Sequence, residues 1–267
     1  MSHVAGWRPR LGSVGEFWRC RDLLLLLAAR DVKVRYQQAV LGVAWVALQP
    51  LAGTLVLTIV FGTLLRPGDP LGYAAFVCAG LVPWTFFSGA TTRCAASLSS
   101  YPGLVTKVYL PRALLPLAAV VSAGLDLAIG ILAAGALALH AGQLGQGRLW
   151  LLVPALLLCF ATSLGAGLWV AALNARFRDV GQILPFALNL GLFVTPVLFD
   201  SSRLPQRLAA WVELNPLAWV VKGFRGALLD QAPPGVDSLG AWGIGVGLLL
   251  TGVVAFSAGD RTLADVV

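Results

Sequence analysis

Long apolar stretches alternate with short polar breaks along most of the chain. Six of these stretches are about as long as the roughly 20 residues that a helix needs to cross the hydrocarbon core of a bilayer. They cover residues 41–65, 73–92, 113–139, 149–173, 182–199 and 239–258. This pattern predicts an all-α polytopic membrane protein with six transmembrane helices. We expect residues 1–267 to form a single transmembrane domain.

A segment of mixed character precedes the first apolar stretch. Between Arg21 and Arg35, charged residues enclose an apolar patch at Leu23–Leu27. On a helical wheel Glu16, Arg19, Asp22, Arg30 and Lys33 share an arc of roughly 120°, which is typical of a helix that lies in the membrane interface. Arg21, Asp31 and Arg35 fall off this arc, so the amphipathicity is moderate. We predict that residues 1–40 form a cytoplasmic N-terminus whose amphipathic interfacial helix leads into the first span.

Two of the breaks are longer than simple turns. In the loop 97–111, the segment Leu104–Tyr109 is too short and too polar to cross a membrane, which favours a brief interfacial helix. In the loop 200–238, Asn215 and Pro216 separate two apolar stretches, and a proline cannot continue a helix. We therefore expect two short outer helices that re-enter the outer leaflet before the last span. In that last span, Gly243 and Gly247 have the spacing of close helix packing.

Charge and composition support a membrane location and set an orientation. Only 12% of residues are charged and the mean hydropathy is +0.83, whereas soluble domains carry about 25% charged residues. The net charge of +7 comes from scattered basic residues, which indicates the membrane–water boundary and not a nucleic-acid partner. With the N-terminus inside, 13 of the 19 basic residues are cytoplasmic. The positive-inside rule therefore places both termini in the cytoplasm.

The sequence lacks the familiar signatures of catalysis. It has no GxxxxGK[ST], HExxH or GxSxG motif, and its two histidines, His3 and His140, are far apart. The four cysteines have no CxxC spacing, so neither a disulfide framework nor a metal site is indicated. We expect no catalytic residue, no metal and no cofactor bound by this chain.

Asp126 is the only carboxylate inside a predicted span, and no partner for it is evident within the spans. A lone intramembrane acid can serve as a proton relay or as a substrate contact. Alternatively it is a carboxyl group hydrogen-bonded to a neighbouring helix. The sequence does not decide between these readings.

Aromatic and charged residues offer two further candidate sets. The aromatic residues line a substrate path or mark the membrane interface; they are Trp45, Trp84, Phe86 and Phe87. The cytoplasmic charged residues contact a partner protein or set the topology; they are Arg30, Asp31, Lys33, Arg35, Lys107, Arg112, Arg176, Arg178 and Asp179.

Five stretches carry a more specific signal. They are Arg30–Pro50, Leu104–Pro116, Phe177–Pro196, Leu214–Leu229 and Leu263–Val267, spread in order over nearly the whole chain. Together they resemble the permease subunit of ABC type-2 exporters for surface polysaccharides such as O-antigen, capsule and teichoic acid. The resemblance implies the ABC type-2 permease fold and a channel-forming subunit in the bacterial inner membrane.

The resemblance also implies partners. These are a second copy of the chain, two ATP-binding cassette subunits that hold ATP and Mg²⁺, a lipid-linked polysaccharide and the membrane lipids, with no nucleic acid. Aromatic rings would then stack on sugar faces, and the cytoplasmic charges would couple the chain to the ATPase. An ABC type-2 exporter of a drug or lipid is the alternative. A membrane-embedded glycosyltransferase would need clustered carboxylates, and an ion-driven carrier would need intramembrane charge pairs; the sequence indicates neither.

Overall fold

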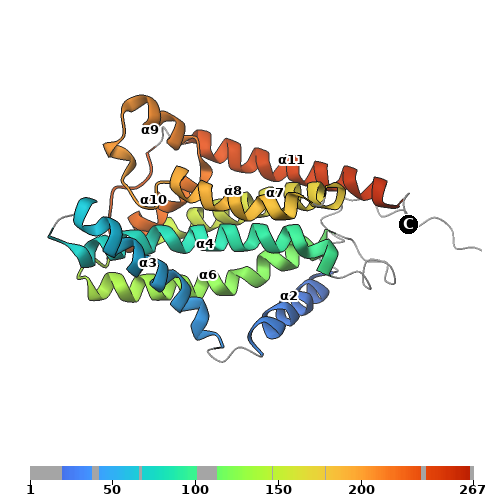
Figure 1. The fold of residues 1–267 in the computed structure, drawn as a ribbon, viewed down its shortest axis with the longest axis horizontal. Coiled ribbons are helices and arrows are strands. Elements are labelled where there is room, and N and C mark those ends of the chain that lie inside the picture. Colours follow the sequence, from blue (N-terminus) through green and yellow to red (C-terminus); the bar gives the residue numbers. More distant parts are fainter. Residues whose placement is uncertain are drawn as a thin grey trace, which may run out of the picture.

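The computed structural model describes residues 20–37, 42–65, 68–100, 113–145, 147–177, 179–235 and 239–264, and these contain helices and connecting turns but no strand. Most of the long helices run side by side along the longest axis (Figure 1). The helices are α2 Arg21–Tyr36, α3 Ala44–Leu65, α4 Pro70–Ser100, α6 Leu114–His140, η1 Leu149–Leu151, α7 Leu152–Arg176, α8 Val180–Val194, η2 Ser201–Arg203, α9 Gln206–Glu213, α10 Pro216–Leu228 and α11 Leu239–Ala264.

Helix α4 occupies the centre of the bundle. Its most apolar window is 72% buried, against 11% for the window of α3 at the periphery. Asp69 begins the helix by accepting a hydrogen bond from the Gly72 amide over 2.8 Å, and Pro70 at its first position needs no amide partner. The core around α4 includes Phe76 and Phe86 of that helix and Phe224 of α10. Neighbouring helices therefore surround the side chains of α4.

Helix α4 is longer than the sequence predicted. The predicted span ended at residue 92, with the aromatic residues Trp84–Phe87 at its end and Arg93 outside it. The helix instead continues to Ser100, which places the aromatic residues in its interior and Arg93 two turns before its end. The apolar run stops near residue 92, but no helix-breaking residue follows until Pro102.

The fifth predicted span is shorter than expected. Among the residues that the structure describes, five helices are long and apolar enough to cross a membrane, whereas α8 has only 15 residues, about 22 Å at 1.5 Å per residue. Within the predicted span 182–199, the helix ends at Val194. The next residue, Thr195, has an extended backbone (φ −86°, ψ 138°) because Pro196 follows it. The chain then turns back toward the bundle through Pro196 and Val197.

The two short helices predicted around Asn215 and Pro216 are present as α9 and α10. Asn215 caps α10 by accepting a hydrogen bond from the Leu217 amide over 3.0 Å. Most of α10 is buried against α4 and α7, whereas α9 exposes Leu208 and Trp211. The helix α10 is therefore part of the core and α9 lies on its surface.

Glycine packing joins α11 to α7, but through residues other than those predicted. A Cβ atom on Gly252 would lie 2.5 Å from the Gly165 carbonyl oxygen, so the two backbones touch there. Gly245 likewise lies against Leu158 of α7. No heavy atom of the described residues lies within 4 Å of a Cβ added to Gly243 or Gly247. The predicted packing role of Gly243 and Gly247 is therefore wrong within one copy of the chain.

Candidate functional site at the junction of α2, α4 and α6

Asp126 of α6 is the centre of a polar cluster built from three helices. Arg35 Nη1 lies 2.6 Å from Asp126 Oδ2, and the Tyr36 hydroxyl donates a hydrogen bond to Oδ1 over 2.6 Å. Arg93 Nη1 of α4 lies 3.3 Å from the same Oδ2. Arg35 Nη2 also donates to the Ser122 hydroxyl over 3.4 Å. One carboxylate therefore joins α2, α4 and α6.

The positions of these residues follow from helical spacing. Ser122 and Asp126 are four residues apart, so they share the face of α6 that meets the last turn of α2. Arg35 and Tyr36 close that last turn, where the guanidinium carbon of Arg35 lies 5.5 Å from the Tyr36 ring centroid. Leu27 and Ala28 of α2 are buried, which supports the docked orientation of the helix.

The prediction that Asp126 has no partner within the spans is wrong. Arg93 lies inside α4, and Arg35 and Tyr36 reach the carboxylate from α2. The side chains of Arg35, Arg93 and Asp126 are 25%, 30% and 20% exposed, so the ion pairs are largely shielded from solvent. Burial, and then the hydrogen bond to Asp126, raise the pKa of Tyr36 above its usual value, so its hydroxyl stays a donor at neutral pH.

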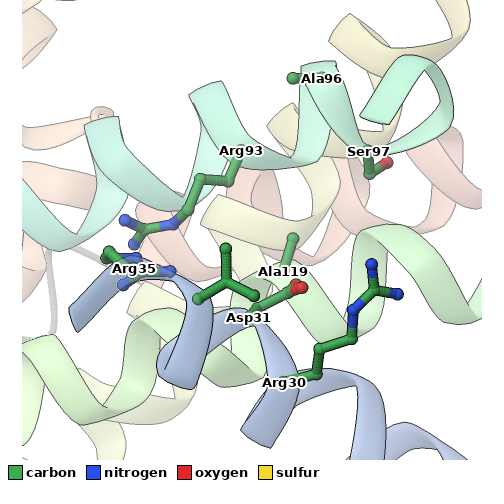
Figure 2. Close-up of a pocket in the computed structure, with 8 residues that line it drawn as sticks. Arg30, Asp31, Arg35, Arg93, Ala96, Ser97 and Ala119 are labelled. Atoms are coloured by element: carbon green, nitrogen blue, oxygen red, sulfur yellow. The ribbon is translucent and has the colours of Figure 1, made fainter. Parts of the chain in front are cut away.

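Two cavities flank the cluster and share Arg35 and Arg93 in their walls. The larger, about 360 Å³, lies between α2 and the C-terminal half of α4, and Arg30 and Asp31 also line it. Figure 2 shows Arg93 extending from α4 toward Arg35 on α2, with Arg30 at the far side of the cavity. The smaller cavity, about 260 Å³, includes Trp45.

The four predicted path aromatics occupy different environments. Trp45 is 54% exposed, and with Phe86 it lines the smaller cavity. Phe86 is otherwise buried, its ring 4.7 Å from that of Phe160 of α7. Trp84 is buried against α8, where Gly191 allows its indole to approach, and Phe87 packs beside it with the ring centroids 5.6 Å apart. A role for these rings in a substrate path stays a prediction.

The predicted coupling residues are also dispersed. Arg35 belongs to the cluster around Asp126, and Arg30 and Asp31 line the larger cavity beside it, with Lys33 on the same helix. Arg176 and Asp179 are exposed at the turn between α7 and α8. Lys107, Arg112 and Arg178 lie outside the described residues, as does the short helix expected at Leu104–Tyr109.

Sequence reasoning did not identify Arg93, Tyr36 or Ser122 as members of a site. The hydropathy falls at Arg93, so the apolar pattern predicts that the second span ends at residue 92 and leaves Arg93 outside it. The absence of any proline or glycine between Gly89 and Pro102 was the available signal that the helix continues. Tyr36 and Ser122 carried no signal of their own, since their role depends on how α2 docks.

Comparison with known proteins shows a family and several relatives. The ABC-2 type transporter family matches residues 22–229. The O-antigen export system permease protein RfbA of Myxococcus xanthus is 29% identical over 228 residues, which cover 85% of this chain and 87% of that protein. A permease of the same name from Klebsiella pneumoniae is 26% identical over 210 residues, 78% of this chain and 81% of that protein.

A polysialic acid transport protein is also similar. The polysialic acid transport protein KpsM of Escherichia coli is 26% identical over 211 residues, which cover 76% of this chain and 80% of that protein. The family match covers most of the chain, including every described helix that contributes to the cluster around Asp126. The chain belongs to the ABC-2 type transporter family.

Proposed function

We propose that this chain is the channel-forming permease subunit of an ATP-driven exporter that moves a lipid-linked polysaccharide from the cytoplasmic side across the bacterial inner membrane. The observation that carries the proposal is that relatives named for O-antigen export and polysialic acid transport align with more than three quarters of the chain. The five membrane-length helices and the short apolar α8 fit a multi-pass transporter. Both termini would then be cytoplasmic, as the distribution of basic residues indicates.

ATP hydrolysis would take place on a separate subunit. The sequence has no phosphate-binding loop for a nucleotide, so two ATP-binding cassette partners would hold ATP and Mg²⁺ beneath two copies of this chain. Closure of the ATPase pair would move the helices that it touches. The α2 helix is well placed to transmit such a movement, because Asp126 connects it directly to α4 and α6.

Helix α8 offers a surface suited to a passing glycan. Gln182, Phe186, Asn189 and Phe193 recur every three to four residues, so they form one stripe, and all four are exposed. Aromatic faces stack on the apolar faces of sugars, and amide groups exchange hydrogen bonds with hydroxyl groups. A stripe of this kind contacts a polymer without fixing any one sugar, as sliding requires. Trp45, exposed on α3, would extend the same type of contact toward the cytoplasmic side.

The test is transport by the reconstituted complex. The chain is co-purified with its candidate ATPase, placed in proteoliposomes, and supplied with radiolabelled lipid-linked polysaccharide and ATP on the ATPase side. We expect ATP-dependent appearance of the glycan on the opposite side and none with the chain alone. Stimulation of the ATPase by an apolar drug or an unglycosylated lipid, without stimulation by the glycan, would instead support a drug or lipid exporter. Glycan elongation without translocation would support a glycosyltransferase.

A further inference from the structure

We propose that Arg35 and Arg93 form a binding site for the phosphate group of a lipid headgroup, and that Asp126 occupies this site as an internal counter-ion. The site lies where α2 meets the bundle, between the two cavities. Guanidinium groups are planar and present several N–H donors, which suits the oxygens of a phosphate. The ligand class is a lipid phosphate monoester or diester.

The charge balance of the junction favours an anion. In the ion-pair cluster itself, Arg35 and Arg93 contribute two positive charges and Asp126 contributes one negative charge. One positive charge is therefore not balanced within this group. Both arginines contact the same carboxylate oxygen, Asp126 Oδ2, and the single negative charge of that carboxylate does not neutralise both guanidinium groups. A phosphate group supplies both the missing charge and more acceptor oxygens.

Arg93 has donor capacity that its protein contacts do not use. Its Nη1 pairs with Asp126, but its Nε is buried and has no hydrogen-bond partner within the part of the chain that the structure describes. A buried donor without a partner costs free energy, so such an atom usually has a ligand or water to meet. Figure 2 shows the Arg93 side chain extending across the cavity wall toward Arg35, which leaves both guanidinium groups accessible from one space.

The cavities suit a headgroup attached to apolar chains. The smaller cavity combines polar groups, such as the Tyr36 hydroxyl and the Gln49 amide, with the apolar surfaces of Trp45 and Val46. Residues Leu25 and Leu26 of α2 are exposed at 59% and 63%, so an apolar surface continues outside the junction. A phosphate at the arginines would therefore have polar surroundings at its own level and apolar surroundings for its chains.

Asp126 sets the affinity of the site. Because its carboxylate already pairs with Arg35 and Arg93, an incoming phosphate must weaken those pairs to bind. Removal of the Asp126 charge should consequently strengthen phosphate binding, while removal of Arg93 should weaken it. A purely structural cluster predicts the same sign for both changes, since each would only loosen the fold.

The phosphate could belong to a bilayer phospholipid or to the lipid carrier of the exported glycan; the second source rests on the proposed function. Binding is measured by isothermal titration calorimetry on the purified full chain in a neutral maltoside detergent. The probes are inorganic phosphate, dihexanoylphosphatidic acid, a glucosyl octyl phosphate diester, and dihexanoylglycerol as the phosphate-free control. Preference for the phosphatidic acid or for the glycosylated phosphate distinguishes the two sources.

We expect both lipid phosphates to bind more tightly than inorganic phosphate and dihexanoylglycerol. Arg93→Gln should weaken lipid phosphate binding about ten- to hundredfold, and Asp126→Asn should strengthen it roughly two- to fivefold. Arg93→Lys, which keeps the charge but loses the fork of donors, should give an intermediate loss and replaces Arg93→Gln if that variant does not fold. Arg148→Gln, in a pair with Asp230 elsewhere on the chain, is the control and should change nothing.

Equal binding of dihexanoylglycerol, or weaker binding by Asp126→Asn that parallels Arg93→Gln, would overturn the proposal. Equal affinity for inorganic phosphate and the lipid phosphates would also overturn it, because the site would then bind an ion alone. This assay needs neither ATP nor a partner subunit. Failure of transport with the expected binding pattern therefore refutes the proposed function only, and transport without that pattern refutes this site only.

Discussion

Arg225 of α10 is a buried cation held by carbonyl groups. It is 4% exposed, and its three nitrogens donate to the carbonyl oxygens of Phe76, Pro196 and Val197 at 3.2, 2.8 and 2.6 Å. Its guanidinium carbon also lies 3.4 Å from the centroid of the Phe76 ring. These carbonyls belong to α4 and to the turn after α8, so one side chain fixes the chain where α8 ends.

Replacement of Arg225 by lysine should destabilise the fold although the charge is kept. The planar guanidinium group of Arg225 donates to three carbonyl oxygens at once. A lysine ammonium is a point charge on a flexible stem and cannot reproduce this geometry. We expect Arg225→Lys to lower the free energy of unfolding by about 2–3 kcal/mol. Thermal unfolding of the detergent-solubilised chain measures this. Arg148→Lys, whose ion pair with Asp230 is about half exposed, is the control and should change it little; equal effects would refute the role of Arg225.

The sequence showed which residues are chemically unusual but not which residues they contact. Asp126 was recognisable from sequence because a carboxylate in an apolar segment is rare. Its contacts were not predictable, since Arg35 lies 91 residues away and reaches Asp126 only when α2 docks on α6. The same holds for Arg225, whose acceptor Phe76 is 149 residues distant. Helical periodicity describes neighbours three or four residues apart and is silent about such pairs.

Element boundaries were predicted best where backbone chemistry determines them. Asn215 and Pro216 separated α9 from α10 as expected, because proline removes an amide donor and asparagine caps the next helix. The end of α8 was missed since hydropathy continued to residue 199, although Pro196 forces Thr195 out of the helical region. At these two boundaries the proline was a better guide than hydropathy, whereas Pro50, Pro83 and Pro185 lie inside helices and end none of them.

The crossing of α7 and α11 depends on the absence of side chains at Gly165 and Gly252. A Cβ atom on Gly252 would lie 2.5 Å from the Gly165 carbonyl oxygen, and a backbone oxygen cannot move aside as a flexible side chain can. We expect Gly252→Ala to destabilise the fold by about 1–3 kcal/mol through overpacking. Gly243→Ala on the same helix has open space and should be neutral or stabilising by up to about 1 kcal/mol. Unfolding curves that do not differ between the two variants would contradict this contact.

The exposed stripe on α8 leads to a prediction about transport and not stability. Asn189→Ala removes an amide that we propose contacts sugar hydroxyl groups, and a single hydrogen bond of this kind changes a rate about two- to tenfold. We expect slower export of the glycan in proteoliposomes with unchanged thermal stability. Leu190→Ala, at a neighbouring position that is 52% exposed, is the matched control. Equal loss in both variants would show that the stripe has no special part in transport.

The ends of the helices define two opposite sides of the bundle. The turn between α7 and α8 and the end of α4 at Ser100 lie at one end of the bundle, whereas α9 and the start of α11 lie at the other (Figure 1). The orientation of these two ends is predicted from basic residues alone.

An impermeant maleimide added to intact cells should label Gly235→Cys, which lies just before α11, and should spare Ser99→Cys until the cells are permeabilised. The Cys20→Ser background removes the partly exposed native thiol. Labelling of Ser99→Cys in intact cells would reverse the orientation.

Coupling to an ATPase should depend on charges at the end of the bundle that carries α2. Arg176 and Asp179 are exposed in the short turn between α7 and α8, where few other groups are available to a cytoplasmic partner. A desolvated ion pair at an interface costs about 2–5 kcal/mol when one partner is removed, whereas a charge that only sets topology costs nothing in binding. We therefore expect Asp179→Ala to reduce co-purification of the ATPase and its stimulated activity while membrane insertion stays unchanged.

The matched control for this experiment is Arg207→Ala, an exposed charge on α9 at the opposite end of the bundle. It should leave ATPase binding and activity as they are, because no cytoplasmic partner reaches that end if the orientation is correct. Arg176→Ala tests whether the effect belongs to the turn or to one carboxylate, since the two residues are three positions apart. If the variants at both ends behave alike, the charges of the turn only orient the chain, and the coupling must run through α2 or through residues outside the described part of the chain.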